Sequence, residues 1–233
     1  MMTMKDCREL VKQSGSFEST ATVLIWKRLL DTSCILIAIP VLLPLFISIS
    51  IAIFTVSRGP VLFRQQRIGH KGRRFTCLKF RTMRVNSAIG VHQNHLSQLI
   101  LSKRPMTKLD VAGDSRLIPL GSFLRSTGLD ELPQLFNILR GEMTLVGPRP
   151  CLSYEFEHYL PWHKERFQAL PGLTGLWQVS GKNKTTFDEM VNLDIFYARN
   201  ASIWLDLKIL LRTIPAVAQQ AWEQNNQRKK AKG

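Results

Sequence analysis

Cysteine is scarce in this sequence, and no two cysteines stand at the spacing of a paired site. The four cysteines of the 233-residue chain, Cys7, Cys34, Cys77 and Cys151, are scattered along it and form no Cys-x-x-Cys pair. This spacing argues against a disulfide scaffold and against a cysteine-liganded zinc site. It is compatible with a reducing compartment.

Acidic residues are also few. The chain has 17 Asp and Glu against 32 Lys and Arg, a formal net charge of +15. Between Asp31 and Asp110 there is no acidic residue, although that interval holds twelve Lys and Arg. Such a balance indicates an anionic partner, which could be nucleic acid, acidic lipid or a phosphorylated substrate. No nucleic-acid-binding motif is present and the basic stretch adjoins an apolar segment, so we expect no nucleic acid partner.

The longest apolar run extends over residues 32–57 and contains no charge in twenty-six residues. A helix needs about 20 apolar residues to cross a bilayer, so a single-pass anchor is one interpretation. However, Pro40 and Pro44 lie near the middle, where proline favours a bend. Basic residues flank both ends, including Lys27 and Arg28 before the run and Arg58 and Arg67 after it. The positive-inside rule places both flanks in the cytoplasm. These features favour a re-entrant membrane helix-hairpin that bends at the two prolines.

The basic stretch after this segment has the apolar spacing of two β-strands. The runs GPVLFRQQRIG and RRFTCLKFRTM are joined by the turn-like GHKG, which predicts a small β-hairpin just below the membrane. Adhesion to anionic lipid accounts for some of these charges. Lys79 and Arg81, however, are embedded among apolar residues, and partly buried cations need an anionic partner. The pattern favours a substrate phosphate over a structural ion pair.

Two adjacent carboxylates, Asp130 and Glu131, precede a short apolar helical pattern that runs to Leu139. Pro133 suits the first turn of a helix and Gly141 suits its end. The carboxylates are therefore expected at or just before a helix N-terminus, where free N–H groups keep them ionised. Ordinary capping is the alternative, but one cap would suffice and adjacent carboxylates repel. Carboxylates can also bind Mg²⁺ or attack phosphorus, and arginines can hold phosphate oxygens.

Three long motifs identify a resemblance. LKFRTM, DSRLIPLGSFLRSTGLDELPQLFNILRGEMTLVGPRP and LPGLTGLWQVSGKN together resemble the bacterial sugar transferases, the monotopic polyprenyl-phosphate phosphoglycosyl transferases, from about Trp26 to Pro215. The resemblance implies transfer of a sugar-1-phosphate from a UDP-sugar to undecaprenyl phosphate, with release of UMP. This is the membrane-committed first step of exopolysaccharide, lipopolysaccharide or other glycoconjugate assembly. It also implies the cytoplasmic face of the bacterial inner membrane.

The resemblance also implies roles for individual residues. Asp130 matches the nucleophile that forms a covalent phosphosugar intermediate, and Glu131 matches a Mg²⁺ ligand. Lys79 and Arg125 match phosphate-contacting positions, and Arg149 of GPRP matches a position at the nucleotide phosphate or uridine end. The family commonly has Ser before the proline of the membrane bend, whereas this chain has Leu43 before Pro44. Pro40 is therefore a second candidate for the bend.

The C-terminal third carries weaker signals. Lys182 and Asn183 either help to seat the nucleotide or belong to a connecting loop. Apolar residues from Trp204 to Ile214 fall on one face and are interrupted by charges, which predicts an interfacial amphipathic helix or a core helix. Asp194 and Tyr197 match family positions near the active site, without an assigned role.

Together these observations predict an α+β fold, mostly helical and monotopic. We expect a mobile N-terminal extension over residues 1–20, the re-entrant membrane helix over 21–57, a cytoplasmic catalytic domain over 58–218 and a basic tail over 219–233. The alternatives are a non-catalytic basic membrane adaptor and a glycosyltransferase that releases UDP. A hexose such as galactose or glucose is the first expectation for the sugar, followed by N-acetylated sugars; oligomeric state has no sequence signal.

Overall fold

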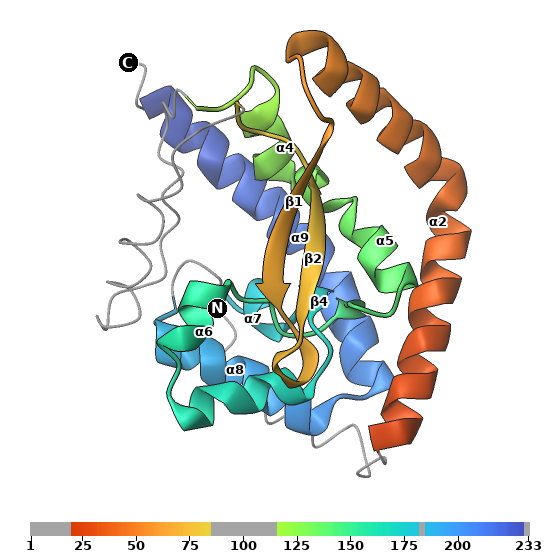
Figure 1. Ribbon diagram of the computed structural model, residues 1–233, viewed down its shortest axis with the longest axis vertical. Coiled ribbons are helices and arrows are strands. Elements are labelled where there is room, and N and C mark those ends of the chain that lie inside the picture. Colours follow the sequence, from red (N-terminus) through yellow and green to blue (C-terminus); the bar gives the residue numbers. More distant parts are fainter. Residues whose placement is uncertain (1–19, 85–115, 182–184, 231–233) are drawn as a thin grey trace.

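The computed structural model of the protein describes residues 20–84, 116–181 and 185–230 (Figure 1). Within them, short helices are numerous and strands are few, which agrees with the expected mostly helical α+β class. In chain order the elements are α2 (Thr20–Val56), β1 (Leu62–Ile68), η1 (His70–Gly72), β2 (Arg74–Phe80), α4 (Gly121–Thr127), η2 (Leu129–Glu131), α5 (Gln134–Leu139), β3 (Thr144–Val146), α6 (Ser153–Glu157), η3 (Pro161–Gln168), β4 (Gly172–Thr174), α7 (Leu176–Val179), α8 (Phe187–Asn200) and α9 (Ile203–Lys230).

Helix α2 is a single helix of 37 residues that bows around one side of the molecule (Figure 1). Pro40 and Pro44 both lie inside it, and no break separates it into two arms. Ile35, Ile49 and Ile53 pack inward. By length and composition, Ile25–Val56 could cross a membrane. The helix thus has a curved shape with its concave side toward the other elements, where the sequence predicted a sharper hairpin.

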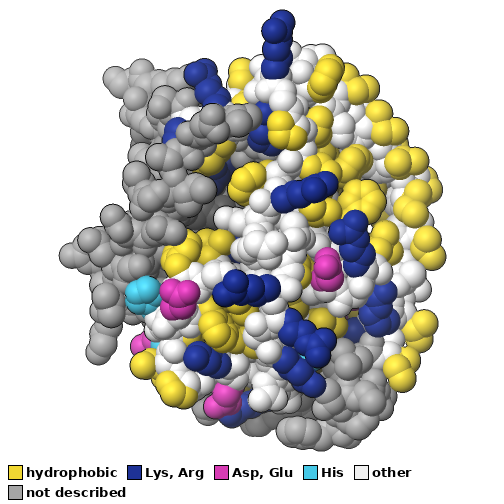
Figure 2. Space-filling model, viewed as in Figure 1, with side chains coloured by type: hydrophobic (Ala, Val, Ile, Leu, Met, Phe, Trp, Pro, Cys, Tyr) yellow, Lys and Arg dark blue, Asp and Glu magenta, His cyan; other side chains and the backbone are white. Residues whose placement is uncertain are grey.

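The outer side of α2 is apolar and uncovered. Figure 2 shows it as a hydrophobic rim beside a face that carries many Lys and Arg side chains. A continuous exposed apolar surface of this kind is typical of a membrane or protein contact. The exposed apolar residues of the helix are Ile25, Leu29, Leu36, Ile37, Ile39, Val41, Leu43, Ile47, Ile51, Phe54 and Val56.

Polar contacts tie the N-terminal turns of α2 to the rest of the chain. Lys27, only 2% exposed, donates to the carbonyl of Val146 at 2.9 Å and forms an ion pair with Asp206 at 2.5 Å. Asp31, one turn further on, accepts a hydrogen bond from the Leu145 N–H at 3.0 Å. The sequence suggested that Lys27 is a flanking charge that sets membrane orientation. It is instead a buried link between α2 and two other elements, β3 and α9.

The other end of α2 is tied down as well. Arg81, which directly follows β2, donates to the carbonyls of Ser57 at 2.5 Å and Arg58 at 3.0 Å. These carbonyls lie just beyond the last turn of α2, where a helix leaves carbonyl groups unpaired. Arg28 makes a similar contact near the first turns, since its guanidinium donates to the carbonyl of Leu139 at 3.0 Å. Both ends of α2 are therefore attached to the same body.

Strands β1 and β2 form the predicted hairpin. They pair antiparallel with Leu62 opposite Phe80 and Ile68 opposite Arg74. The turn between them includes Lys71 and Gly72 with positive φ angles of 54° and 74°. Glycine adopts this left-handed region without cost, and a single other residue is tolerated there in a tight turn.

Strands β3 and β4 are short and parallel, and their glycines allow two backbones to meet. A Cβ on Gly172 would lie 2.1 Å from the nitrogen of Gly147, and one on Gly147 would lie 2.2 Å from the carbonyl oxygen of Leu170. No side chain larger than hydrogen fits at such distances. The close approach brings the segment GPRP against the segment PGLTG, two motifs that are well separated in the sequence.

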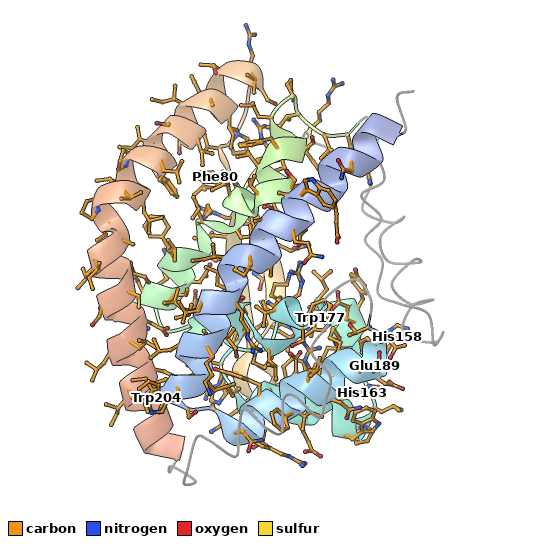
Figure 3. The ribbon with its side chains drawn as sticks, turned by 180° about the vertical axis from the view of Figure 1, so that it is seen from behind. Phe80, His158, His163, Trp177, Glu189 and Trp204 are labelled. Carbon is orange, nitrogen blue, oxygen red and sulfur yellow. The ribbon has the colours of Figure 1, made fainter. Side chains whose placement is uncertain are left out.

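The C-terminal helices build the largest apolar core. Helix α8 begins at a capping box in which Thr186 accepts from the Glu189 N–H, and α9 follows it directly. Figure 3 shows α9 crossing the far face diagonally, starting at Trp204 near one end of α2. It continues through Lys230 without a break at the expected 218/219 boundary, so most of the predicted tail is a helical extension. Core residues here include Val146, Phe167, Leu176, Trp177, Phe187, Met190, Val191, Leu193, Tyr197, Leu205 and Ile209.

Candidate active site

A small cavity opens where the β-hairpin, the acidic turn and the two glycine-containing segments meet. It contains about 250 Å³ of empty space, which is in part open to solvent. Its walls come from parts of the chain that are distant in sequence, so it exists only in the folded protein. The lining residues are Arg67, Cys77, Lys79, Glu131, Gln134, Arg149, Pro150, Gly172, Leu173 and Gln178.

Glu131 is the carboxylate of this cavity, and basic side chains surround it. Lys79 Nζ lies 2.6 Å from its Oε1, and Arg149 Nη1 lies 3.8 Å from the same oxygen. All three side chains are partly exposed, so solvent screens their interactions. The structure therefore brings together three residues predicted to handle phosphate or metal, one each from β2, the acidic turn and GPRP.

Asp130 precedes Glu131 within the turn η2 and is 9% exposed. It is not one of the residues that line the cavity, although its neighbour is. The sequence predicted that both carboxylates lie at or just before the N-terminus of the apolar helix. They lie just before it, in a separate 3₁₀ turn, and α5 begins at Gln134. Pro133 explains the separation, because it lacks the N–H that a continuous helix would use.

The buried side of α5 carries two amides as well as an apolar residue. Gln134, Asn137 and Ile138 are buried, whereas Phe136 and Leu139 are 45% and 43% exposed. Asn137 accepts from the Leu78 N–H at 3.0 Å and donates to the carbonyl of Thr76 at 2.7 Å. These bonds connect α5 to β2 and set the distance between Lys79 and Glu131.

Arg67 is a cavity residue that the sequence interpretation left among the flanking charges. It is 8% exposed and donates to the carbonyl of Pro150 at 3.1 Å and to the side-chain oxygen of Gln65 at 2.7 Å. Burial, followed by the nearby Arg149 charge, lowers the pKa of its guanidinium. The pairing register of the two strands would have identified Arg67, because alternate residues of paired strands share a face. Gln65 is opposite Cys77, so Arg67 lies on the face that also carries Lys79.

Two glutamines in the cavity were also missed. Gln134 is 3% exposed. The Oε1 of Gln178 is buried and has no hydrogen-bond partner among the residues that the structure describes. An amide can donate and accept, so these groups suit neutral hydroxyl or carbonyl groups of a ligand. Glutamine in a helical pattern carries no signal of its own, which is why sequence reasoning passed over both.

The backbone of residues 146–150 is held by buried basic side chains. The carbonyl of Val146 accepts from Lys27 at 2.9 Å and from the Tyr197 hydroxyl at 2.8 Å. The carbonyl of Arg149 accepts from Arg166 at 3.0 Å. With the bond from Arg67 to Pro150, three cations from different elements anchor the segment that carries Arg149.

The remaining predicted residues lie elsewhere. Arg81 contacts the end of α2 and does not line the cavity. Arg125 is a partly buried residue of α4 and also does not line it. Pro40 and Pro44 lie within α2. Lys182 and Asn183 fall outside the described residues.

The cavity suits a metal that a substrate helps to bind. Within the described ranges, no cluster of three or more His, Cys, Asp or Glu side chains could hold an ion alone. Mg²⁺ commonly takes one or two carboxylates and completes its shell with substrate phosphates and water. Glu131 supplies a carboxylate at the cavity, and Arg67, Lys79 and Arg149 supply charge for a diphosphate. The donor set fits Mg²⁺ bound jointly with a phosphorylated ligand.

The chain belongs to the bacterial sugar transferase family, since the model of that family, described as bacterial sugar transferase, matches residues 22–220. This confirms the resemblance that the motifs carried.

The names of individual relatives refer to a lipid carrier or to undecaprenyl phosphate. The chain is 39% identical over 225 residues to the UDP-galactose-lipid carrier transferase of Erwinia amylovora and 37% identical over 223 residues to the undecaprenyl-phosphate galactose phosphotransferase of Salmonella typhimurium. Each match covers 93% of this chain and 44% of the relative, so the chain spans less than half the length of these proteins. It is 38% identical to the UDP-glucose:undecaprenyl-phosphate glucose-1-phosphate transferase of Caulobacter vibrioides, with 82% of this chain and 69% of the relative covered.

Proposed function

We propose that this protein transfers a hexose-1-phosphate from a UDP-sugar to undecaprenyl phosphate and releases UMP. The reaction would be the membrane-committed first step of exopolysaccharide, lipopolysaccharide or other glycoconjugate assembly. The observation that carries the proposal is the cavity that Glu131 lines together with Arg67, Lys79 and Arg149, with Asp130 directly before Glu131 in the chain. The names of relatives that act on UDP-glucose and on galactose support a hexose.

In the proposed mechanism, Asp130 is the nucleophile. Its carboxylate attacks the phosphorus that bears the sugar, and the bond from that phosphorus to the UMP oxygen breaks. UMP leaves with the electron pair, and an acyl phosphate joins Asp130 to the sugar. A phosphate oxygen of undecaprenyl phosphate then attacks the same phosphorus and frees the carboxylate. Splitting one displacement into two is the usual advantage of a covalent intermediate.

The basic residues of the cavity stabilise charge during both displacements. Lys79 and Arg149 already contact one oxygen of Glu131, so a diphosphate entering the cavity would find cations on two sides. Arginine can hold two phosphate oxygens at once. Glu131 would hold Mg²⁺ together with phosphate oxygens, and the ion would neutralise charge on the leaving phosphate.

We propose that α2 is re-entrant and that both of its ends lie at the cytoplasmic face of the inner membrane. Lys27 and Arg28 attach one end, and Arg81 attaches the other end to the same body. A true span would need its ends on opposite sides of the bilayer. Cysteines placed by Glu18→Cys and Lys230→Cys in a background without native cysteine should both escape an impermeant thiol reagent in intact cells. Labelling of only one of them would overturn this topology.

The surface around the cavity suits a lipid-linked acceptor. Phe136 and Leu139 of α5 are exposed next to α2, and α9 exposes Trp204, Leu211 and Ile214. Exposed apolar side chains on such helices are typical of interfacial helices. Helix α9 also buries Leu205 and Ile209 in the core, so it packs on the protein and exposes apolar residues at the same time. The acceptor phosphate could then reach the cavity while its polyprenyl chain stays in the membrane.

The identity of the released nucleotide tests the proposal. Purified protein in detergent, given Mg²⁺, undecaprenyl phosphate and either UDP-galactose or UDP-glucose, should release UMP and form a lipid-linked sugar diphosphate. Release of UDP would instead indicate a glycosyltransferase that moves only the sugar. No release of either nucleotide with any UDP-sugar would favour a non-catalytic basic adaptor.

A further inference from the structure

Arg166 reaches the segment that carries Arg149 from the core of the C-terminal third. Its Nη2 donates to the carbonyl of Arg149 at 3.0 Å, and its Nη1 donates to the Tyr159 hydroxyl at 3.0 Å. The guanidinium also forms an ion pair with Asp194 on α8. Arg166 is 1% exposed, as is Asp194. A buried guanidinium is costly unless its charge and its donors are matched, and here the Arg149 carbonyl is one of its acceptors.

The carbonyl that Arg166 holds belongs to a residue with little backbone freedom. Arg149 stands between Pro148 and Pro150. Proline fixes its own φ and restricts the residue before it, so Pro150 confines the backbone of Arg149 to the extended region. The hydrogen bond from Arg166 fixes the orientation of the peptide after Arg149 within that region. The direction in which the Arg149 side chain leaves the backbone is then fixed as well.

We infer that Arg166 is a positioning residue for nucleotide binding: neutralised by Asp194, it holds the Arg149 carbonyl and so directs the Arg149 side chain into the cavity beside Glu131. The inference rests on the proposed function, in which Arg149 contacts the phosphates of the UDP-sugar. Burial raises the pKa of the Asp194 carboxyl to about 6, and the Arg166 charge opposes that rise, so the two groups act as one unit.

The competing explanation is that the ion pair only docks η3 on α8. The chain offers a matched control for this explanation. Arg199 of α8 and Glu165 of η3 form a second ion pair between the same two elements, with side chains 65% and 42% exposed. Arg199→Met removes that pair without touching the segment 146–150. If the Arg166–Asp194 pair served only to dock η3 on α8, variants that remove either pair would change the stability of the protein and would leave UDP binding unchanged.

Arg166→Lys separates positioning from folding. Lysine keeps the charge that Asp194 needs, but its single ammonium group cannot replace the guanidinium fork that also reaches the Arg149 carbonyl. We expect the Kd for UDP to rise about tenfold, as for loss of one hydrogen bond from a charged group. The KM for UDP-sugar should rise similarly, while the KM for undecaprenyl phosphate should stay within about twofold. Arg199→Met should leave all three values unchanged.

A double-mutant cycle on UDP binding decides whether Arg166 acts through Arg149. The full-length protein in detergent is titrated with UDP as wild type, Arg166→Lys, Arg149→Ala and the double variant, with thermal unfolding recorded for each. If Arg166 acts through Arg149, the double variant should bind UDP no more weakly than Arg149→Ala, because coupled residues are not additive. Additive losses, or an unchanged Kd in Arg166→Lys, would overturn the inference.

The outcomes also distinguish this inference from the proposed function. A wild-type protein that releases UMP, combined with an additive cycle, would overturn the positioning role alone. A wild-type protein that binds no UDP would overturn both. Should Arg166→Lys fail to fold, Asp194→Asn, which leaves the guanidinium in place with a neutral partner, gives the same cycle with a smaller expected loss of UDP affinity.

Discussion

Helices α5 and α8 differ in the kind of side chain that each one exposes. Helix α8 buries Phe187, Met190, Val191 and Leu193 and exposes charged residues such as Asp188 and Arg199, as a helix of a water-soluble domain does. Helix α5 buries Gln134 and Asn137 together with Ile138, and it exposes Phe136 and Leu139.

The difference follows from what surrounds each helix. On the α8 side the exposed residues are mostly charged and the buried ones belong to the apolar core. On the α5 side the exposed residues continue the apolar surface of α2, as the contact between the Phe136 and Phe46 rings at 5.6 Å shows, and the buried residues include two amides beside Ile138. An apolar pattern in sequence therefore identifies a face and leaves open whether that face points inward or outward.

The largest expected effect lies in the turn η2, which precedes α5. Asp130→Asn keeps size and polarity but removes the anionic oxygen that attacks phosphorus, so turnover should fall by more than about a thousandfold. The variant should still fold and bind UDP. With UDP-sugar alone, the wild type should gain the mass of one hexose phosphate on a peptide that contains Asp130. UMP release that requires both substrates, with no trapped adduct, would contradict the covalent step.

Glu131→Gln should have the next largest effect. It keeps the shape of the side chain and removes one charged oxygen from the predicted metal site, so we expect turnover to fall roughly a hundredfold. EDTA should abolish wild-type activity and Mg²⁺ should restore it. Lys79→Met serves as a comparison, because it removes the partner at 2.6 Å while leaving the carboxylate in place. Undiminished wild-type turnover in chelator would refute the metal assignment.

The smallest effects are expected when one leucine of α8 and one leucine of α5 are each replaced by alanine. Leu193 of α8 is 4% exposed, whereas Leu139 of α5 is 43% exposed. Leu193→Ala should lower the free energy of unfolding by about 2–5 kcal/mol, because it leaves a cavity in the core. Leu139→Ala should change it by less than about 0.5 kcal/mol and should weaken retention on vesicles instead. Thermal unfolding in one detergent measures the first quantity, and equal losses would break the contrast between the helices.

The features that were predicted correctly from the sequence are those that depend on neighbouring residues. The antiparallel hairpin of β1 and β2 followed from its apolar spacing and its turn. The long apolar helix followed from its composition. Turn residues and proline act within a few positions, so such features can be seen without tertiary contacts. The same applies to the motifs that placed the chain in its family.

The sequence by itself determined which residues carry charge suited to phosphate, since Lys79, Glu131 and Arg149 were all predicted and all meet in the cavity. Only the tertiary structure decided which other residues line the cavity with them. It brought Arg67, Gln134 and Gln178 to the same cavity, moved Arg81 to the end of α2 and made Lys27 a buried link to β3. Burial and long-range hydrogen bonds depend on which segments meet in space, and a local pattern holds no information on that meeting. An isolated Arg looks the same in sequence whether it will hold a substrate, cap a helix or, like Arg166, hold the backbone of another arginine.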